Sequence, residues 1–151
     1  MKVSEGRSLL LGVNHIDTLK ALTELCLCLR ETGDDYPLCI KLYVKLLGLQ
    51  KRKLGPSSSE VYDTMYIIGN LYKHEGSFDK AEYYFSHSLS GYESIEGAYH
   101  PITLNIIDTL ATLQHVNLGK KREAYSLYYK MVQVGRFISF SLFNNIIVYN
   151  I

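Results

Sequence analysis

The sequence predicts an all-α fold in which antiparallel helix pairs stack into a right-handed superhelix, that is, a solenoid. Two observations carry this prediction. First, apolar residues recur at intervals of three and four along several segments, which is the period of one helix face. Second, three similar short segments place glycines at intervals of 43 and 42 residues, at Gly12, Gly55 and Gly97. A period of this length indicates a stacked-repeat architecture.

The clearest unit lies in the middle of the chain, in the stretch EVYDTMYIIGNLYKHEGSFDKAEYYFSHSL. It predicts two amphipathic helices separated by a break at Gly76. Their apolar stripes are Met65, Ile68 and Tyr72 on the first helix and Phe78, Ala81, Phe85 and Leu89 on the second. Gly69 lies beside the first stripe and Ala81 is the small residue of the second. We therefore expect these two residues to face each other where the helices approach closely.

This pattern of large and small residues resembles the tetratricopeptide repeat (TPR) motif. With the unit numbered from Tyr62, the motif's positions 4, 7, 8, 11, 17, 20 and 24 carry Met65, Ile68, Gly69, Tyr72, Phe78, Ala81 and Phe85. A plain TPR has a period of about 34 residues, so each unit here is roughly eight residues longer. Such long units with an LG-x-x-HP linker are typical of the kinesin light chain and nephrocystin-like subclass. That linker is complete only at residues 97–101.

The resemblance extends to both sides of the middle unit and predicts a repeat domain over residues 1–134. Its expected parts are a partial preceding repeat at 1–11 and three repeats at about 15–53, 59–95 and 100–134, followed by an irregular tail at 135–151. In the first repeat, Cys26 and Cys39 take the two small-residue positions. In the third, Gln114 at position 11 and one extra residue before Gly119 depart from the motif.

Composition narrows the class of protein. A formal net charge of +1 over 151 residues argues against a nucleic-acid binder, which needs a basic face to neutralise phosphates. An odd number of cysteines, three, placed within predicted helices favours a reducing compartment, and we expect a cytoplasmic protein. No stretch reaches the roughly 18 apolar residues of a membrane helix, so no membrane partner is expected.

No catalytic or metal-binding pattern stands out. The five histidines show no i,i+4 pair, and the sequence contains no HExxH, GxSxG, P-loop or GxGxxG motif. Cys26 and Cys28 would point about 200° apart on a helix, so core packing explains them better than a metal site. We expect neither an enzyme nor a bound cofactor or metal.

The TPR resemblance implies a concave groove lined by the first helix of each unit at positions 2, 5, 9, 12 and 13. Carried over by position, the groove residues are Lys20, Thr23, Leu27, Arg30 and Glu31 in the first repeat, Asp63, Tyr66, Asn70, Lys73 and His74 in the second repeat, and Asn105, Asp108, Thr112, His115 and Val116 in the third repeat. This mixed polar set suits an extended peptide, since an Asn amide can bond its backbone and a Tyr ring offers rigid contact area.

The predicted function is therefore non-catalytic binding of a peptide or protein segment in the groove, as an adaptor or scaffold. Exposed solenoid ends make self-association a further expectation. One alternative is a structural segment of a longer array without a groove ligand of its own. Another is a HEAT-like or armadillo solenoid, whose period of about 40–47 residues also fits. The Asn pairs and the carboxylate clamp of other TPR proteins are incomplete here, so their ligands cannot be transferred.

Overall fold

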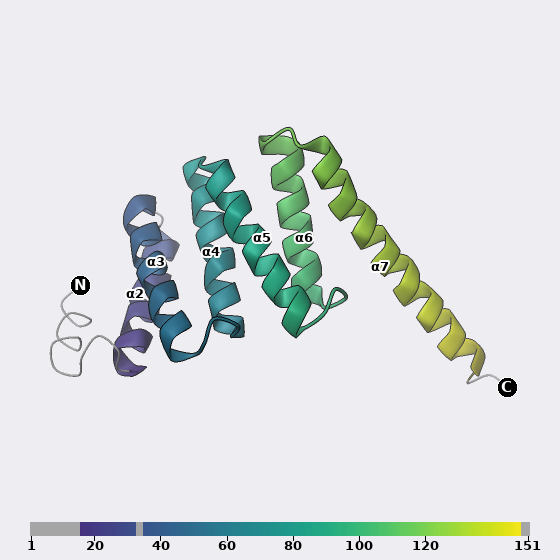
Figure 1. Ribbon diagram of the computed structural model, residues 1–151, viewed down its shortest axis with the longest axis horizontal. Coiled ribbons are helices and arrows are strands. Elements are labelled where there is room, and N and C mark those ends of the chain that lie inside the picture. Colours follow the sequence, from purple (N-terminus) through teal and green to yellow (C-terminus); the bar gives the residue numbers. More distant parts are fainter. Residues whose placement is uncertain (1–15, 33–34, 149–151) are drawn as a thin grey trace. The chain divides into compact units, whose positions relative to one another are not determined.

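The computed structural model describes residues 16–32 and 35–148, and within them all regular structure is helical (Figure 1). The elements are α2 (Ile16–Thr32), α3 (Tyr36–Lys53), α4 (Ser59–Glu75), α5 (Phe78–Ile95), α6 (Pro101–Thr112), the π-helix η1 (Leu113–Asn117) and α7 (Lys121–Val148). The all-α fold predicted from the sequence is confirmed. The partial repeat expected at 1–11 lies outside the described residues.

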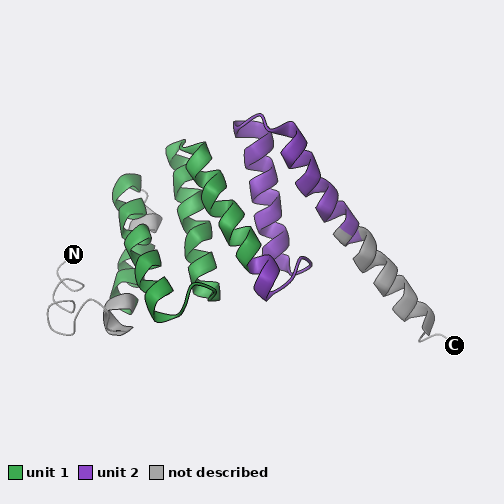
Figure 2. Cartoon of the chain, viewed as in Figure 1, with its two compact units in different colours: residues 1–91 green, residues 92–151 purple. Residues whose placement is uncertain are grey.

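The chain divides into two compact units, residues 1–91 and 92–151 (Figure 2). In the first unit, α3 packs against both α2 and α4. In the second, α6 and η1 pack against α7. No described helix is both long and apolar enough to cross a membrane.

The core of the first unit is continuous through α2, α3 and α4. It includes both cysteines of the small-residue positions, Cys26 and Cys39, which are buried. Its other buried members are Leu22, Ile40, Tyr43, Leu46, Leu47, Leu49, Val61, Met65, Ile68 and Leu71. These positions recur at the helical period, which explains why each segment folds as a helix with one buried face.

The close approach of α4 and α5 differs in detail from the sequence prediction. A Cβ atom at Gly69 would lie 2.7 Å from two ring carbons of Phe85, so the space left by the glycine is filled by that ring. Ala81 is also buried, but it is not the nearest neighbour of Gly69. The aromatic residue one turn beyond Ala81 reaches further across the interface than the methyl group of an alanine can.

Ser88 gives the same helix pair a polar contact. Its side chain is completely buried. Its hydroxyl donates a hydrogen bond to the backbone carbonyl of Tyr62 at 2.9 Å. A buried hydroxyl without a partner would be destabilising, and this bond removes that penalty. The bond therefore fixes the second half of α5 against the start of α4.

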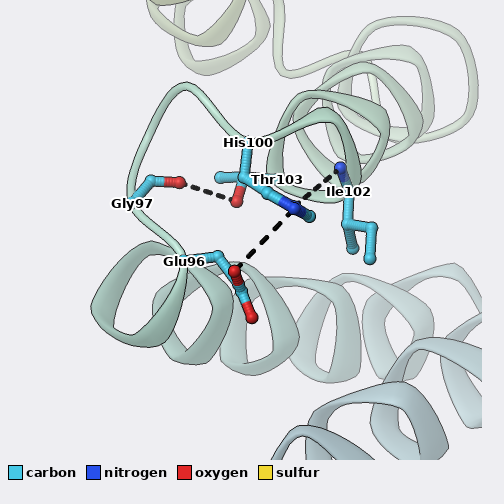
Figure 3. Close-up of polar contacts among 5 residues, drawn as sticks. All are labelled: Glu96, Gly97, His100, Ile102 and Thr103. Carbon is cyan, nitrogen blue, oxygen red and sulfur yellow. Dashed lines mark hydrogen bonds and ion pairs between the residues drawn. The ribbon is translucent and has the colours of Figure 1, made fainter.

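Polar contacts among residues of the linker and the first turn of α6 fix the linker before this helix (Figure 3). Gly97 has a φ of +87°, the left-handed conformation that glycine adopts most readily after a helix. The Thr103 hydroxyl donates to the Gly97 carbonyl at 2.8 Å, and His100 Nδ1 accepts from the Ile102 amide at 3.4 Å. His100 is also 3.8 Å from the Glu96 carboxylate. Histidine thus caps the helix here, and Ser58 takes the equivalent position before α4.

The π-helix η1 accounts for the extra residue noted before Gly119. The Leu118 amide donates to the Leu113 carbonyl at 3.1 Å, a spacing of five residues rather than the four of an α-helix. A turn widened in this way absorbs one residue without rotating the helix that precedes it. Leu113 and Gln114 remain buried, so the motif departure at Gln114 is compatible with packing.

The irregular tail expected at 135–151 is not what the structure shows. Helix α7 continues from Lys121 without a break to Val148. Residues 135–148 contain no proline, and their one glycine is Gly135. The apolar residues there alternated too weakly to indicate a helix face, but nothing in the segment interrupts backbone hydrogen bonding.

Candidate functional site

Helix α4 carries the central residues of the predicted groove. Tyr66, Asn70 and Lys73 are half-buried, whereas Asp63 and His74 are exposed. Tyr66, Asn70 and His74 follow one another at intervals of four residues, so they lie along one face of the helix. This face is therefore where a ligand of the first unit would be expected.

A hollow of about 280 Å³ lies on this face. Its lining residues are Tyr36, Tyr66, Ile67, Asn70, Leu71 and His74. Three of the predicted groove residues, Tyr66, Asn70 and His74, are thus brought together around one cavity. The neighbouring Lys73 is not part of its lining.

Ring contacts shape the walls of the hollow. The Tyr36 and His74 rings stack with their centroids 5.8 Å apart and their planes 11° from parallel. Because Tyr36 begins α3 and His74 lies in the last turn of α4, these two helices run antiparallel. Tyr66 packs against Phe85, with 5.4 Å between ring centroids. The Tyr66 ring is therefore anchored to the core through Phe85.

The Asn70 side chain supplies the polar group of the hollow. Its Nδ2 atom donates to the backbone carbonyl of Tyr66 at 3.2 Å, one turn earlier in α4. This bond fixes the orientation of the amide. A second N–H of the same group and the Oδ1 atom are the chemical groups that an incoming backbone would engage.

Tyr36 is the site residue that the sequence did not indicate. The groove prediction used only the first helix of each unit, and Tyr36 belongs to a second helix. A helix that runs antiparallel to its neighbour places its first residues beside that neighbour's last turn. Tyr36 could have been found by asking which residue of the preceding unit lies opposite His74.

The other predicted groove residues do not line this hollow. On α2, Lys20 is exposed and Thr23 and Leu27 are half-buried, while the side chain of Arg30 lies outside the described residues. In the second unit, Asn105, Asp108 and His115 are exposed. Thr112 is half-buried, and its hydroxyl is hydrogen-bonded to the Tyr128 hydroxyl at 3.3 Å.

The second unit has a hollow of its own, of about 410 Å³. It lies where α6 and η1 meet the start of α7, and it is lined by Leu110, Gln114, Arg122, Glu123, Ser126 and Leu127. None of these residues belongs to the predicted groove. The arrangement offers both signs of charge at its rim and apolar walls between them.

The cysteines are free thiols, and two of the three are buried. Burial, reinforced by the nearby Cys39, raises the pKa of Cys26 to about 12. A thiol with such a pKa is neutral at physiological pH and is a poor nucleophile or metal ligand. Among the described residues, no group of three or more His, Cys, Asp or Glu side chains is placed to hold a metal ion.

Comparison with known proteins identifies the repeat. Residues 60–132 match the family model described as Tetratricopeptide repeat, and this segment includes most of α4, all of α5 and α6, and the start of α7. This segment of the chain is a tetratricopeptide repeat region. This match also decides between the TPR interpretation and the HEAT-like or armadillo alternatives.

Solved structures share the fold of this TPR chain. BtubC (BKLC) from P. vanneervenii superposes with a TM-score of 0.66 at 14% identity, over 78% of this chain and 45% of BtubC. The nearly identical TPR-like repeats of a kinesin light chain-like protein from Podosopora anserina give 0.51 at 13% identity, over 89% of this chain and 82% of that one. The fold expected of the kinesin light chain subclass is confirmed.

The chain spans less than half the length of BtubC. No curated protein is similar enough in sequence to count as a match.

Proposed function

We propose that this TPR chain is a non-catalytic interaction module that binds an extended peptide or protein segment on the exposed face of α4. TPR repeats generally mediate contacts between proteins, and the chain belongs to that class by its repeat pattern. The observation that carries the proposal is the hollow formed by Tyr36, Tyr66, Asn70 and His74. It gathers aromatic surface and a positioned amide in one place.

The chemistry of the hollow suits a peptide better than a cofactor. Its volume of about 280 Å³ is at the lower limit of the roughly 300–1,000 Å³ of pockets that enclose drug-sized ligands. A single apolar side chain of a bound segment would fit against Ile67 and Leu71. The Asn70 amide would then hydrogen-bond the segment's backbone, as amides do for extended peptides.

The test is a selection of peptides from a random display library against the immobilised chain. The affinity of each selected peptide would then be measured for the intact chain and for the double variant Asn70→Ala with His74→Ala. We expect the double variant to bind at least about tenfold more weakly, because it loses the amide and one face of the ring stack; a loss of this size corresponds to about 1.4 kcal/mol.

The matched control is Lys41→Ala. Lys41 is an exposed residue of α3 that does not line the hollow. Peptides that bind the α4 face should keep their affinity for this variant, and circular dichroism should show equal helix content in all three proteins. Enrichment of no peptide, or equal affinity for the double variant, would contradict the proposal and favour a structural segment without a ligand of its own.

We further propose that the chain acts in the cytoplasm, which its free cysteines favour. Association of the chain with a second copy, expected from the sequence, also stays a proposal at this stage.

A further inference from the structure

Helix α7 carries an apolar stripe that the described part of the chain leaves uncovered. Tyr125, Tyr129 and Val132 are 70%, 54% and 58% exposed. Their spacing of four and three residues places them on one helix face. The Tyr125 and Tyr129 rings stack with 6.4 Å between centroids, so the two side chains form one aromatic surface.

Comparison with α3, the second helix of an earlier repeat, shows how the equivalent face is packed there. Helices α3 and α7 can be aligned on their buried small residues, Cys39 and Ala124. The stripe residues of α7 then correspond, in order, to Ile40, Val44 and Leu47 of α3. Ile40 and Leu47 are each only 6% exposed, and α4 packs on α3. Two of the three positions exposed on α7 are therefore buried on α3, where α4 packs, whereas Val44, the counterpart of Tyr129, is 40% exposed.

Helix α2 presents the complementary face. Aligning α2 with α4 on Cys26 and Gly69 makes Ala21, Leu25 and Cys28 the counterparts of Thr64, Ile68 and Leu71. The three α4 residues are buried. On α2, Cys28 is exposed and Ala21 and Leu25 are half-buried. The face that α4 uses in the interior of the chain is thus accessible on α2.

We propose that the α7 stripe of one copy docks onto the Ala21–Cys28 face of α2 in a second copy. The contact would repeat between molecules the packing of α3 on α4 within one molecule. The two faces are complementary in size, because the large Tyr125 and Tyr129 rings would meet the small side chains of Ala21 and Cys28. Such a large-on-small arrangement allows two helices to approach closely.

Charge complementarity supports the same pairing and its direction. In the interior contact, the first residue of α3, Tyr36, stacks on His74 in the last turn of α4. The corresponding residue of α7 is Lys121, which is exposed, and the corresponding position of α2 is Glu31. An antiparallel α7–α2 contact would therefore bring positions of opposite charge together.

The proposed contact joins two different faces, so it is a head-to-tail contact. Each copy that binds through α7 still offers its own α2, and growth is not limited to a dimer unless the ring closes. This geometry makes the proposal testable by complementation, because a copy blocked at one face remains able to use the other.

The experiment measures molar mass by sedimentation velocity over a range of protein concentrations. The intact chain should grow in mass beyond a dimer as concentration rises. Tyr129→Asp, which blocks the α7 face, and Cys28→Arg, which blocks the α2 face, should each be monomeric. An equimolar mixture of the two variants should form a one-to-one dimer, joined through the intact α7 of one and the intact α2 of the other.

The control is Tyr83→Asp, which changes a tyrosine of α5 that is 58% exposed and lies on neither face. It should associate as the intact chain does, and circular dichroism should show the same helix content in all variants. A monomeric intact chain at every concentration overturns the proposal. So does a mixture that stays monomeric, because the two faces would then not meet. A Cys28→Arg variant that still associates by itself also overturns it, because α7 would then pair with α7.

Discussion

At the scale of single residues, the contact between Gly69 and Phe85 makes a strong prediction about stability. A methyl group at Gly69 would lie 2.7 Å from the Phe85 ring, which is completely buried and cannot move aside freely. Overpacking of this kind costs about 1–3 kcal/mol. Replacing a helical glycine by alanine otherwise stabilises by about 0.5–1 kcal/mol. We expect Gly69→Ala to lower the free energy of unfolding, measured by urea denaturation followed at 222 nm.

Gly48 provides the matched comparison. It also lies within a helix, α3, but a Cβ atom there would meet no heavy atom within 4 Å. Gly48→Ala should therefore raise the free energy of unfolding by about 0.5–1 kcal/mol. Equal effects of the two substitutions would show that helix propensity alone determines the change in the free energy of unfolding. The close contact with Phe85 would then contribute nothing to it.

At the scale of elements, the π-helix makes a prediction about deletions. Val116 is 70% exposed in η1, and removing it would convert the five-residue hydrogen-bond spacing of this turn to the four-residue spacing of an α-helix. We expect the variant lacking Val116 to remain folded, with a melting temperature within a few degrees of the intact chain. The measurement is thermal unfolding followed by circular dichroism.

The contrasting deletion removes Ile67 from the middle of α4. This helix has no widened turn, so the loss of one residue rotates everything beyond it by about 100°. Ile68 and Gly69 would leave the core, and the first unit should lose its cooperative unfolding transition. If both deletions were equally tolerated, the π-turn could not be regarded as the place where the extra residue is absorbed.

The elements also show what the sequence could predict and what it could not. The α4–α5 pair was predictable because its packing needs particular residue types that can be recognised in the sequence. These are a buried glycine, the aromatic residues near it and a glycine at the break, Gly76. Of the residues that line the hollow, only those on α4 could be predicted from the sequence. Tyr36 belongs to the hollow through the antiparallel placement of α3, which is a tertiary effect. The length of α7 was missed because a helix can continue where apolar periodicity is weak, provided that no residue breaks it.

At the scale of the whole molecule, a core substitution in a repeat protein should destabilise only the helices near it, because each repeat contacts only its neighbours. Phe85 is completely buried in the first unit, and Phe85→Ala should cost about 3–5 kcal/mol. We expect amide hydrogen exchange in α4 to accelerate more than tenfold, while exchange in α6 changes much less. Hydrogen exchange followed by mass spectrometry measures both helices in one experiment.

The reciprocal variant is Ile107→Ala in α6, which empties an equally buried position of the second unit. It should accelerate exchange in α6 and α7 and leave α4 nearly unchanged. The two variants together separate local from global unfolding, since a globally cooperative molecule would show the same acceleration in every helix for both substitutions. That outcome would contradict the prediction. The expected opposite patterns would mean that the α4 face can retain its ligand-binding geometry when the second unit is locally open.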